Sequence, residues 1–181
     1  KSYENIWKFK AISVSGAPAF SPVSDNVYDA RWSPDGKVIC ALSNNTKGGY
    51  IFKLIPIKGG ETLLVKINKT ELNGDPFPIK ASPDLTMLTF WIAGEDGKKD
   101  IYIAPFSLKE AKTTSPARLI FKDWSAGPYN TSFSWSPDGT RIGLIHEEDI
   151  WIVPLKGGNP IQITHTPEHE LYPRWSPDGT M

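Results

Sequence analysis

The sequence contains little that would cross-link the protein, charge it strongly or anchor it in a membrane. Its 181 residues include a single cysteine, Cys40, so an intrachain disulfide is excluded and the thiol is expected to pack as a small hydrophobe. Twenty basic and 20 acidic residues cancel, so no net field favours nucleic acid. No stretch reaches the roughly 20 apolar residues of a membrane-spanning helix. We therefore expect neither nucleic-acid binding nor membrane insertion.

Motifs of common active sites are also missing. The sequence has no Gly-x-Ser-x-Gly elbow, no phosphate-binding loop and no cysteine cluster. Its three histidines are His146, His165 and His169. His165 and His169 bracket Thr-Pro-Glu and could share a metal with Glu168 or Glu170, but a solvated loop explains the same residues without a ligand. We predict no catalytic residue, no metal and no cofactor for this chain.

What the sequence does contain is a repeated pentapeptide, Trp-Ser-Pro-Asp-Gly. Full copies occupy residues 32–36, 135–139 and 175–179, and a degraded copy, Ala-Ser-Pro-Asp-Leu, occupies 81–85. Successive copies lie 49, 54 and 40 residues apart, a spacing typical of repeated structural units. An Asn/Asp-Ile-Trp/Tyr tripeptide and a proline before an apolar residue follow the same order along the chain.

The chemistry of the pentapeptide predicts a tight turn beside a packing anchor. Proline presets φ at the second turn position, aspartate suits the third, and glycine supplies the left-handed fourth. The serine hydroxyl can accept a hydrogen bond from a nearby amide, and the tryptophan is large enough to wedge into a neighbouring sheet. We assign this structural role to Trp32, Pro34, Asp35, Gly36, Pro83, Asp84, Trp135, Pro137, Asp138, Gly139, Trp175, Pro177, Asp178 and Gly179. In the degraded copy Leu85 replaces glycine, and since a left-handed leucine costs about 1–2 kcal/mol, we predict that this turn changes type.

Four short runs of strand character surround each pentapeptide. The first precedes it; the second runs are 38–43, 86–93 and 140–146, the third 50–57, 100–108 and 149–155, and the fourth 61–67, 117–121 and 160–165. Residues 170–175 would form the first strand of a further unit. Glycine pairs at 59–60 and 157–158 suit tight turns between third and fourth strands. The predicted class is all-β.

Units of four strands and about 40–50 residues resemble the blades of a β-propeller. The order of pentapeptide, apolar strand, Asn/Asp-Ile-Trp/Tyr and Gly-rich hairpin is similar to the TolB-type propeller repeat, which also builds the propeller domains of prolyl-oligopeptidase-type peptidases. The resemblance covers essentially the whole chain. It implies antiparallel four-stranded blades at residues 28–67, 76–121 and 131–166, with partial blades at 1–20 and 171–181. It also implies that the strand before each pentapeptide is the innermost and lines a central channel.

Three whole and two partial blades do not close a ring of the usual size. In one interpretation, which we favour, residues 1–181 are part of a larger propeller of which about four blades are present. In the other, residues 1–20 and 171–181 build one shared blade and close a four-bladed ring. The first interpretation leaves blade edges open, so it predicts self-association.

Acidic and aromatic residues gather in connections that a propeller would place on one face. We predict that this face binds a protein or peptide partner. Trp124 and Tyr129 lie in a connection between blades, where exposed aromatics often anchor interfaces, although Trp124 suits packing over a neighbouring blade equally well. The candidate contact residues are Glu95, Asp96, Trp124, Tyr129, Glu147, Glu148, Asp149, His165, Glu168 and His169.

The resemblance implies two alternative functions. The first is a non-catalytic scaffold that binds a partner through its loops, in the periplasm where TolB-like proteins take part in envelope assemblies. The second is the substrate-gating propeller of a prolyl-oligopeptidase-type serine peptidase whose hydrolase domain lies outside this chain. A propeller enzyme with a metal held by histidines of several blades is a third, which three histidines support poorly.

Overall fold

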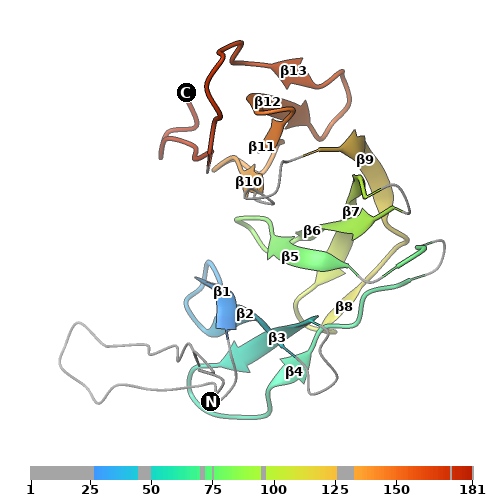
Figure 1. Cartoon of the computed structure of the whole chain (residues 1–181). Coiled ribbons are helices and arrows are strands. Elements are labelled where there is room, and N and C mark those ends of the chain that lie inside the picture. Colours follow the sequence, from blue (N-terminus) through green and yellow to red (C-terminus); the bar gives the residue numbers. More distant parts are fainter. Residues whose placement is uncertain are drawn as a thin grey trace, which may run out of the picture.

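The computed structural model describes residues 27–44, 50–69, 72–74, 76–94, 97–125, 133–171 and 173–180. These residues form antiparallel strands and turns without any helix (Figure 1). In this part of the chain there is accordingly no helix long and apolar enough to cross a membrane. The strands assemble into three sheets that follow one another along the chain, which confirms the predicted all-β class for the described residues.

The first and third sheets contain four strands each, hydrogen-bonded in chain order. The strands of the first sheet are β1 (Val27–Trp32), β2 (Val38–Asn44), β3 (Tyr50–Pro56) and β4 (Leu63–Leu64). Those of the third sheet are β10 (Phe133–Trp135), β11 (Arg141–His146), β12 (Asp149–Pro154) and β13 (Ile161–Gln162). The second and third strands fall where the apolar runs predicted them. The fourth strands are shorter than predicted, because only two residues of β4 and of β13 pair with the strand before.

The second sheet has a strand that the sequence did not predict. Its members are β5 (Phe77–Ala81), β6 (Met87–Ala93), β7 (Lys99–Ser107), β8 (Lys112–Thr113) and β9 (Arg118–Trp124). Both β8 and β9 pair with β7. The unpredicted strand β8 also bonds to the segment after β4, where Lys66 donates to Ala111 at 2.8 Å and accepts from Thr113 at 2.9 Å. This short strand ties the outer edges of the first two sheets together.

The described residues of the range 170–175 do not form the further first strand that the sequence predicted. Residues 173–175 pair with no described strand, and Pro173 has no N–H to contribute to a ladder. The turn that follows them forms nevertheless, with the Gly179 amide donating to the Ser176 carbonyl at 2.9 Å. The turn is a local structure, whereas a strand exists only with a partner. The predicted partial blade at residues 1–20 lies outside the described residues.

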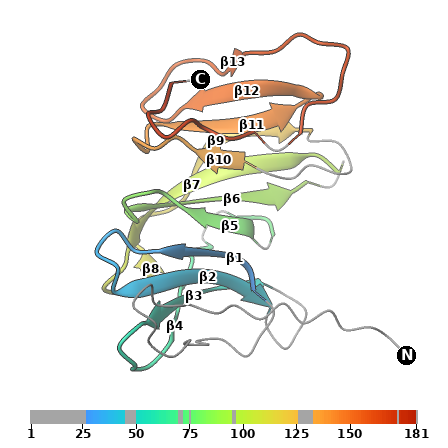
Figure 2. The same cartoon turned by 90° about the vertical axis from the view of Figure 1, so that its left-hand side faces the viewer.

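The sheets stack face to face, and two apolar clusters fill the spaces between them (Figure 2). Between the first and second sheets, side chains such as Leu42 and Phe52 meet Leu88 and Phe90. Between the second and third, Ile101 meets a corresponding set that includes Phe133 and Leu144. The middle strands are covered on both sides, so they read as continuous apolar runs rather than alternating ones. Burial of each large side chain contributes about 1.5–3 kcal/mol.

Cys40 belongs to the first of these clusters and exposes 2% of its surface. Burial raises the pKa of its thiol to about 11. Because the thiolate is the reactive form of cysteine, this thiol is unreactive at neutral pH. Its predicted role as a small core hydrophobe is confirmed.

The pentapeptide turns have the predicted geometry. In the copy at Ser136, the Gly139 amide donates to the Ser136 carbonyl at 2.9 Å, and Gly139 is left-handed with a φ of 67°. The serine hydroxyl accepts from the Arg141 amide at 3.0 Å and donates to Asp138, which also accepts from the Thr140 amide at 3.0 Å. Hydrogen bonds from Ser136 and Thr140 lower the pKa of Asp138 to about 2. The ionised carboxylate therefore holds the turn together at neutral pH.

The prediction for the degraded copy is wrong: its turn keeps the same type. Leu85 has a φ of 57°, and its amide donates to the Ser82 carbonyl at 3.0 Å, as glycine does in the other copies. The Leu85 side chain is 4% exposed and belongs to the core between the first two sheets. Burial of a leucine contributes about 1.5–3 kcal/mol, which offsets the cost of about 1–2 kcal/mol for a left-handed residue. Tertiary packing outweighs local strain at this turn.

The tryptophans of the repeat pack against a neighbouring sheet in two of three cases. Trp135 is 5% exposed within the core of the second and third sheets. Trp175 lies against the third sheet, where its indole N–H donates to the Ser134 carbonyl at 3.1 Å and the Arg141 guanidinium stacks 4.6 Å from its ring. Trp32 is 51% exposed, because no described sheet lies beyond the first one. For Trp32 the predicted wedge is therefore not found.

Two substitutions test whether burial decides the conformation of these turns. Gly139→Ala should lower the free energy of unfolding by about 1–2 kcal/mol, because its φ of 67° is strained for alanine although a Cβ would lie 3.8 Å from the nearest atom. Leu85→Gly relieves the same strain but empties a core position, so it should cost about 2–4 kcal/mol. Urea denaturation measures both, and a stabilised Leu85→Gly variant would contradict the role of Leu85 burial.

Candidate partner-binding surface

The connections that carry the predicted contact residues meet on one face. Strands β2, β6 and β11 all end on the same side of the stack, to the right in Figure 2. On this side the turn between β11 and β12 bonds to two other connections. The Glu147 amide donates to the Ser125 carbonyl at 2.9 Å, and the Glu170 amide donates to the Glu148 carbonyl at 3.0 Å. We call the surface formed by Ser125, residues 147–149 and residues 165–170 the loop face.

The turn at the centre of the loop face is strained. His146 pairs with Asp149 across the strands, so only Glu147 and Glu148 connect β11 to β12. Both have positive φ, 48° and 74°. A two-residue hairpin turn of this kind favours Asn-Gly, because each non-glycine residue in the left-handed region costs about 1–2 kcal/mol. The chain places two glutamates there instead.

Both glutamates direct their carboxylates into solvent. The side chains of Glu147 and Glu148 are 75% and 59% exposed. Glu148 Oε1 lies 3.0 Å from His169 Nδ1, which brings the two predicted contact residues together. An exposed ion pair of this kind contributes at most about 1 kcal/mol, so it does not explain why the strained turn carries glutamates.

His146 lies beneath this turn and is held as a neutral ring. Its Nδ1 accepts a hydrogen bond from the Ser125 amide at 3.2 Å, which leaves the proton on Nε2. Burial lowers the pKa of His146, although nearby Glu147 opposes the shift. The ring also makes edge contacts with Phe121 and Trp151. His146 is thus a structural support that fixes the connection at Ser125 against the turn.

Asp149 and Trp124 have internal roles. The Asp149 carboxylate accepts from Gln162 Nε2 at 2.8 Å and from Thr164 Oγ1 at 3.0 Å, so it fastens the chain after β13 to β12. Trp124 is fully buried, and its indole N–H donates to the Ile145 carbonyl of the third sheet. The expectation that Trp124 is an exposed contact is therefore wrong. Its alternative, packing against a neighbouring unit, is the one observed.

The remaining predicted residues divide between exposed and undescribed positions. His165, Glu168 and His169 are exposed on the loop face. Glu95, Asp96 and Tyr129 lie outside the described residues. No group of three or more potential metal ligands occurs within the part of the chain that the structure describes, and His169 Nδ1 contacts Glu148 Oε1.

Comparison with known protein structures identifies the fold of this chain. No family model matches the chain. TolB from Acinetobacter baumannii superposes with a TM-score of 0.68 at 20% identity over 95% of this chain and 41% of that one. A putative TolB from Agrobacterium tumefaciens gives 0.64 at 20% identity over 95% of this chain and 58% of that one. The fold is a β-propeller, similar to that of these two structures.

The chain is also similar in sequence to a peptidase. An uncharacterized peptidase, YuxL, of Bacillus subtilis is 28% identical over 104 residues, which are 54% of this chain and 15% of that protein. The chain therefore spans only part of the length of each of these relatives. The sheets described above are propeller blades, and their strand order, with the first strand at one edge, agrees with what the resemblance implied. The predicted boundaries between blades stay predictions.

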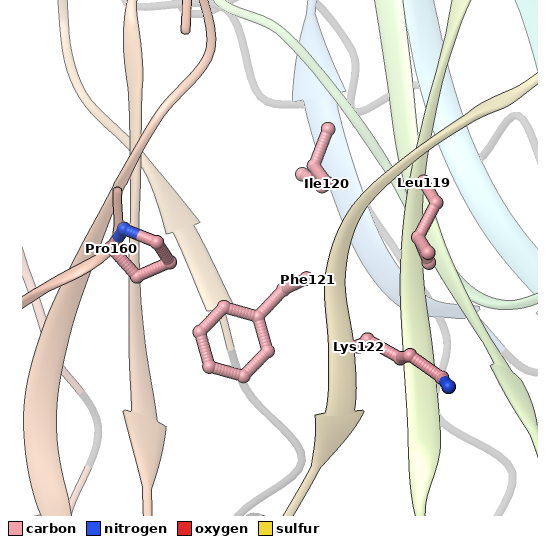
Figure 3. A pocket seen from close by; sticks show the side chains of 5 residues that line it. All are labelled: Leu119, Ile120, Phe121, Lys122 and Pro160. Atoms are coloured by element: carbon pink, nitrogen blue, oxygen red, sulfur yellow. The ribbon is translucent and has the colours of Figure 1, made fainter. Parts of the chain in front are cut away.

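The outer edge of the propeller carries a shallow apolar pocket of about 370 Å³. Leu119, Ile120, Phe121 and Lys122 of β9 line it together with Pro160 from the connection before β13. Figure 3 shows the Phe121 ring pointing towards Pro160 across the junction of two blades. The pocket is thus a seam between neighbouring outer edges.

Sequence reasoning missed the residues that hold the loop face together. Ser125 and Glu170 contribute through their backbone groups, which leave no signature in residue type. The strained turn did leave a signal. Only two residues, Glu147 and Glu148, separate runs of strand character, and a loop of that length demands positive φ at both positions.

The strain in this turn can be measured. Replacing the pair with the sequence that the turn favours, Glu147→Asn with Glu148→Gly, should raise the free energy of unfolding by about 1 kcal/mol, since relief of strain exceeds the loss of an exposed ion pair. Chemical denaturation provides the measurement. A Glu148→Gln control, which removes the ion pair but keeps the strain, should change stability by less than about 0.5 kcal/mol. Destabilisation of the Asn-Gly variant would show that the glutamates stabilise the turn.

Proposed function

We propose that this chain is a non-catalytic propeller scaffold that binds a protein or peptide partner through its loop face. The observation that carries the proposal is the turn at Glu147 and Glu148. Two exposed carboxylates are held by left-handed backbone that glutamate adopts at a cost of about 1–2 kcal/mol each. Strained backbone of this kind is concentrated at functional sites. Here the strain brings the fold no compensating gain in stability. We attribute the strained turn to selection for a partner that contacts the two carboxylates.

The charge of the loop face defines the partner that fits it. Glu147, Glu148, Glu168 and Glu170 all belong to the loop face, where Glu148 contacts His169, while the chain as a whole is neutral. A partner with lysine or arginine side chains would meet complementary charge there, which steers association and fixes orientation. The TolB-type resemblance supports a position outside the cytoplasm for this interaction. It supports the scaffold role through fold alone, because both superposed structures are 20% identical.

A second candidate function follows from the sequence match to a peptidase. In that case the propeller filters substrates for a serine peptidase domain encoded elsewhere in the same protein, and this chain again performs no chemistry. The 28% identity over 104 residues favours this candidate. The parent reading frame separates the two. A Gly-x-Ser-x-Gly motif followed by aspartate and histidine would establish the gating role, and further propeller repeats without that motif would establish the scaffold.

Charge reversal tests the loop face directly. The double variant Glu147→Lys/Glu148→Lys should weaken binding of a fluorescein-labelled hexalysine peptide by at least about tenfold in an anisotropy titration, because two attractive contacts become repulsive. The turn keeps its strain in this variant, so its melting temperature should stay close to that of the wild type.

A matched control comes from the opposite face. Glu61 is exposed beside the glycine-pair turn between β3 and β4, and Glu61→Lys should change the peptide affinity by less than about twofold. If Glu61→Lys and the double variant lost peptide affinity equally, the effect would come from the net charge of the chain and not from the loop face. Unchanged binding in the double variant would remove the loop face as the binding surface.

A further inference from the structure

Basic residues recur at one position of the repeat. The residue directly before each tryptophan, or before the alanine that replaces it, is Arg31, Lys80, Ser134 or Arg174. In the three sheets this position pairs with the same place on the second strand, since Arg31 lies opposite Cys40, Lys80 opposite Thr89 and Ser134 opposite Gly143. Three of the four residues at this repeat position are therefore cations.

The fold brings these positions together. Strands β1, β5 and β10 lie side by side along one edge of the stack in both views (Figures 1 and 2). Asp29 and Arg31 of β1 line a small enclosed cavity together with Lys80 of β5. The Lys80 ammonium also donates to the Phe133 carbonyl of β10 at 2.9 Å. Lys80 thus contacts residues of the two flanking blades. We call the edge that carries Arg31, Lys80, Ser134 and Arg174 the inner edge.

Positive charge exceeds negative charge along the inner edge. Burial lowers the pKa of Lys80, and the nearby charges of Arg31 and Arg174 lower it further, while Asp29 opposes them. Asp29 is the carboxylate that faces this group, and its Oδ2 lies 4.0 Å from Arg31 Nε. Three cations therefore share one carboxylate in a chain whose total charge is zero. The arrangement is costly without a partner, because like charges repel.

The donors at the inner edge remain accessible. The Arg31 side chain is 38% exposed, and Arg174 is exposed. Lys80 carries three N–H donors, of which the Phe133 carbonyl accepts one. By contrast, Arg141 at the opposite end of the blade is engaged internally, where it donates to the Gly179 carbonyl and stacks on Trp175. The inner edge thus presents guanidinium forks of the geometry that binds carboxylates in a bidentate manner.

We propose that the inner edge binds an extended acidic peptide segment whose carboxylates contact Arg31, Lys80 and Arg174. The cations come from successive repeats rather than from one blade, so a ligand with several anionic groups along a chain satisfies them better than a single compact anion. Stacked sheets lie about 10 Å apart, and an extended peptide rises about 3.3 Å per residue. Carboxylates three residues apart therefore match Arg31 and Lys80, whose blades are neighbours, whereas Arg174 lies one repeat beyond the uncharged Ser134. This site is separate from the loop face and does not depend on it.

The test uses a fluorescein-labelled peptide with glutamate at every third position and serine between. The full chain should bind it saturably in an anisotropy titration, and the double variant Arg31→Gln/Arg174→Gln should weaken binding by at least about tenfold. The same peptide with glutamine in place of glutamate should not bind. Inorganic phosphate should compete only at concentrations far above that of the peptide.

A charge-matched control separates the inner edge from net charge. Arg118→Gln/Lys122→Gln removes two cations from the exposed outer strand β9 and should alter the affinity by less than about twofold. Absence of saturable binding, or equal losses in the two double variants, would overturn the proposal. Displacement by equimolar phosphate would do the same, because it would indicate a site for compact anions. If the Arg31 change unfolds the chain, Arg174→Gln alone must still reduce affinity several-fold. The loop-face variant Glu147→Lys/Glu148→Lys should retain acidic-peptide binding, so each surface can fail independently.

Discussion

The packing of each sheet against the next is the constraint on which the rest of the structure depends. A single repeat unit cannot bury its hydrophobic faces alone, and the middle strands are apolar on both sides. Between the second and third blades, the fully buried rings of Trp124 and Phe133 lie 6.3 Å apart, and the Trp124 indole bonds across the junction to Ile145. The loop face exists only because this junction brings Ser125, Glu148 and Glu170 together. The inner edge likewise forms only when successive first strands are stacked.

A neutral chain carries two surfaces of opposite sign. The loop face gathers exposed glutamates on a strained turn, and the inner edge gathers cations at one position of the repeat. The buried clusters between the sheets consist of apolar side chains and include no residue of either surface. A repeated fold of this kind leaves its loops and its inner positions available for recognition. Both surfaces suit binding of a polypeptide, whether the chain is a scaffold or the gating part of a peptidase.

Local chemistry predicted the turns and the central strands, because both depend on residues close in sequence. The amide hydrogen bond to the serine hydroxyl and the left-handed glycine at Gly139 followed from the pentapeptide alone. The errors arose where distant contacts decide. Leu85 adopts a strained conformation because its side chain reaches the core. The short strand β8 exists through its bonds to the segment after β4, and Trp124 is buried by a blade that follows it in sequence. The inner edge was not predicted, because Arg31 and Arg174 lie more than a hundred residues apart in the sequence. Only the stacking of the sheets brings their charges close to Lys80.

Neighbouring blades of this fold stabilise each other. Hydrogen exchange of the variant Phe133→Leu tests this stabilisation most directly, because Phe133 belongs to the third blade and contacts Trp124 of the second. We predict faster exchange of the amides of β7 and β9 in the second blade as well as those of β10 and β11, with protection reduced by about tenfold or more on both sides of the junction. Reduced protection confined to β10–β13, with the second blade unchanged, would contradict the account.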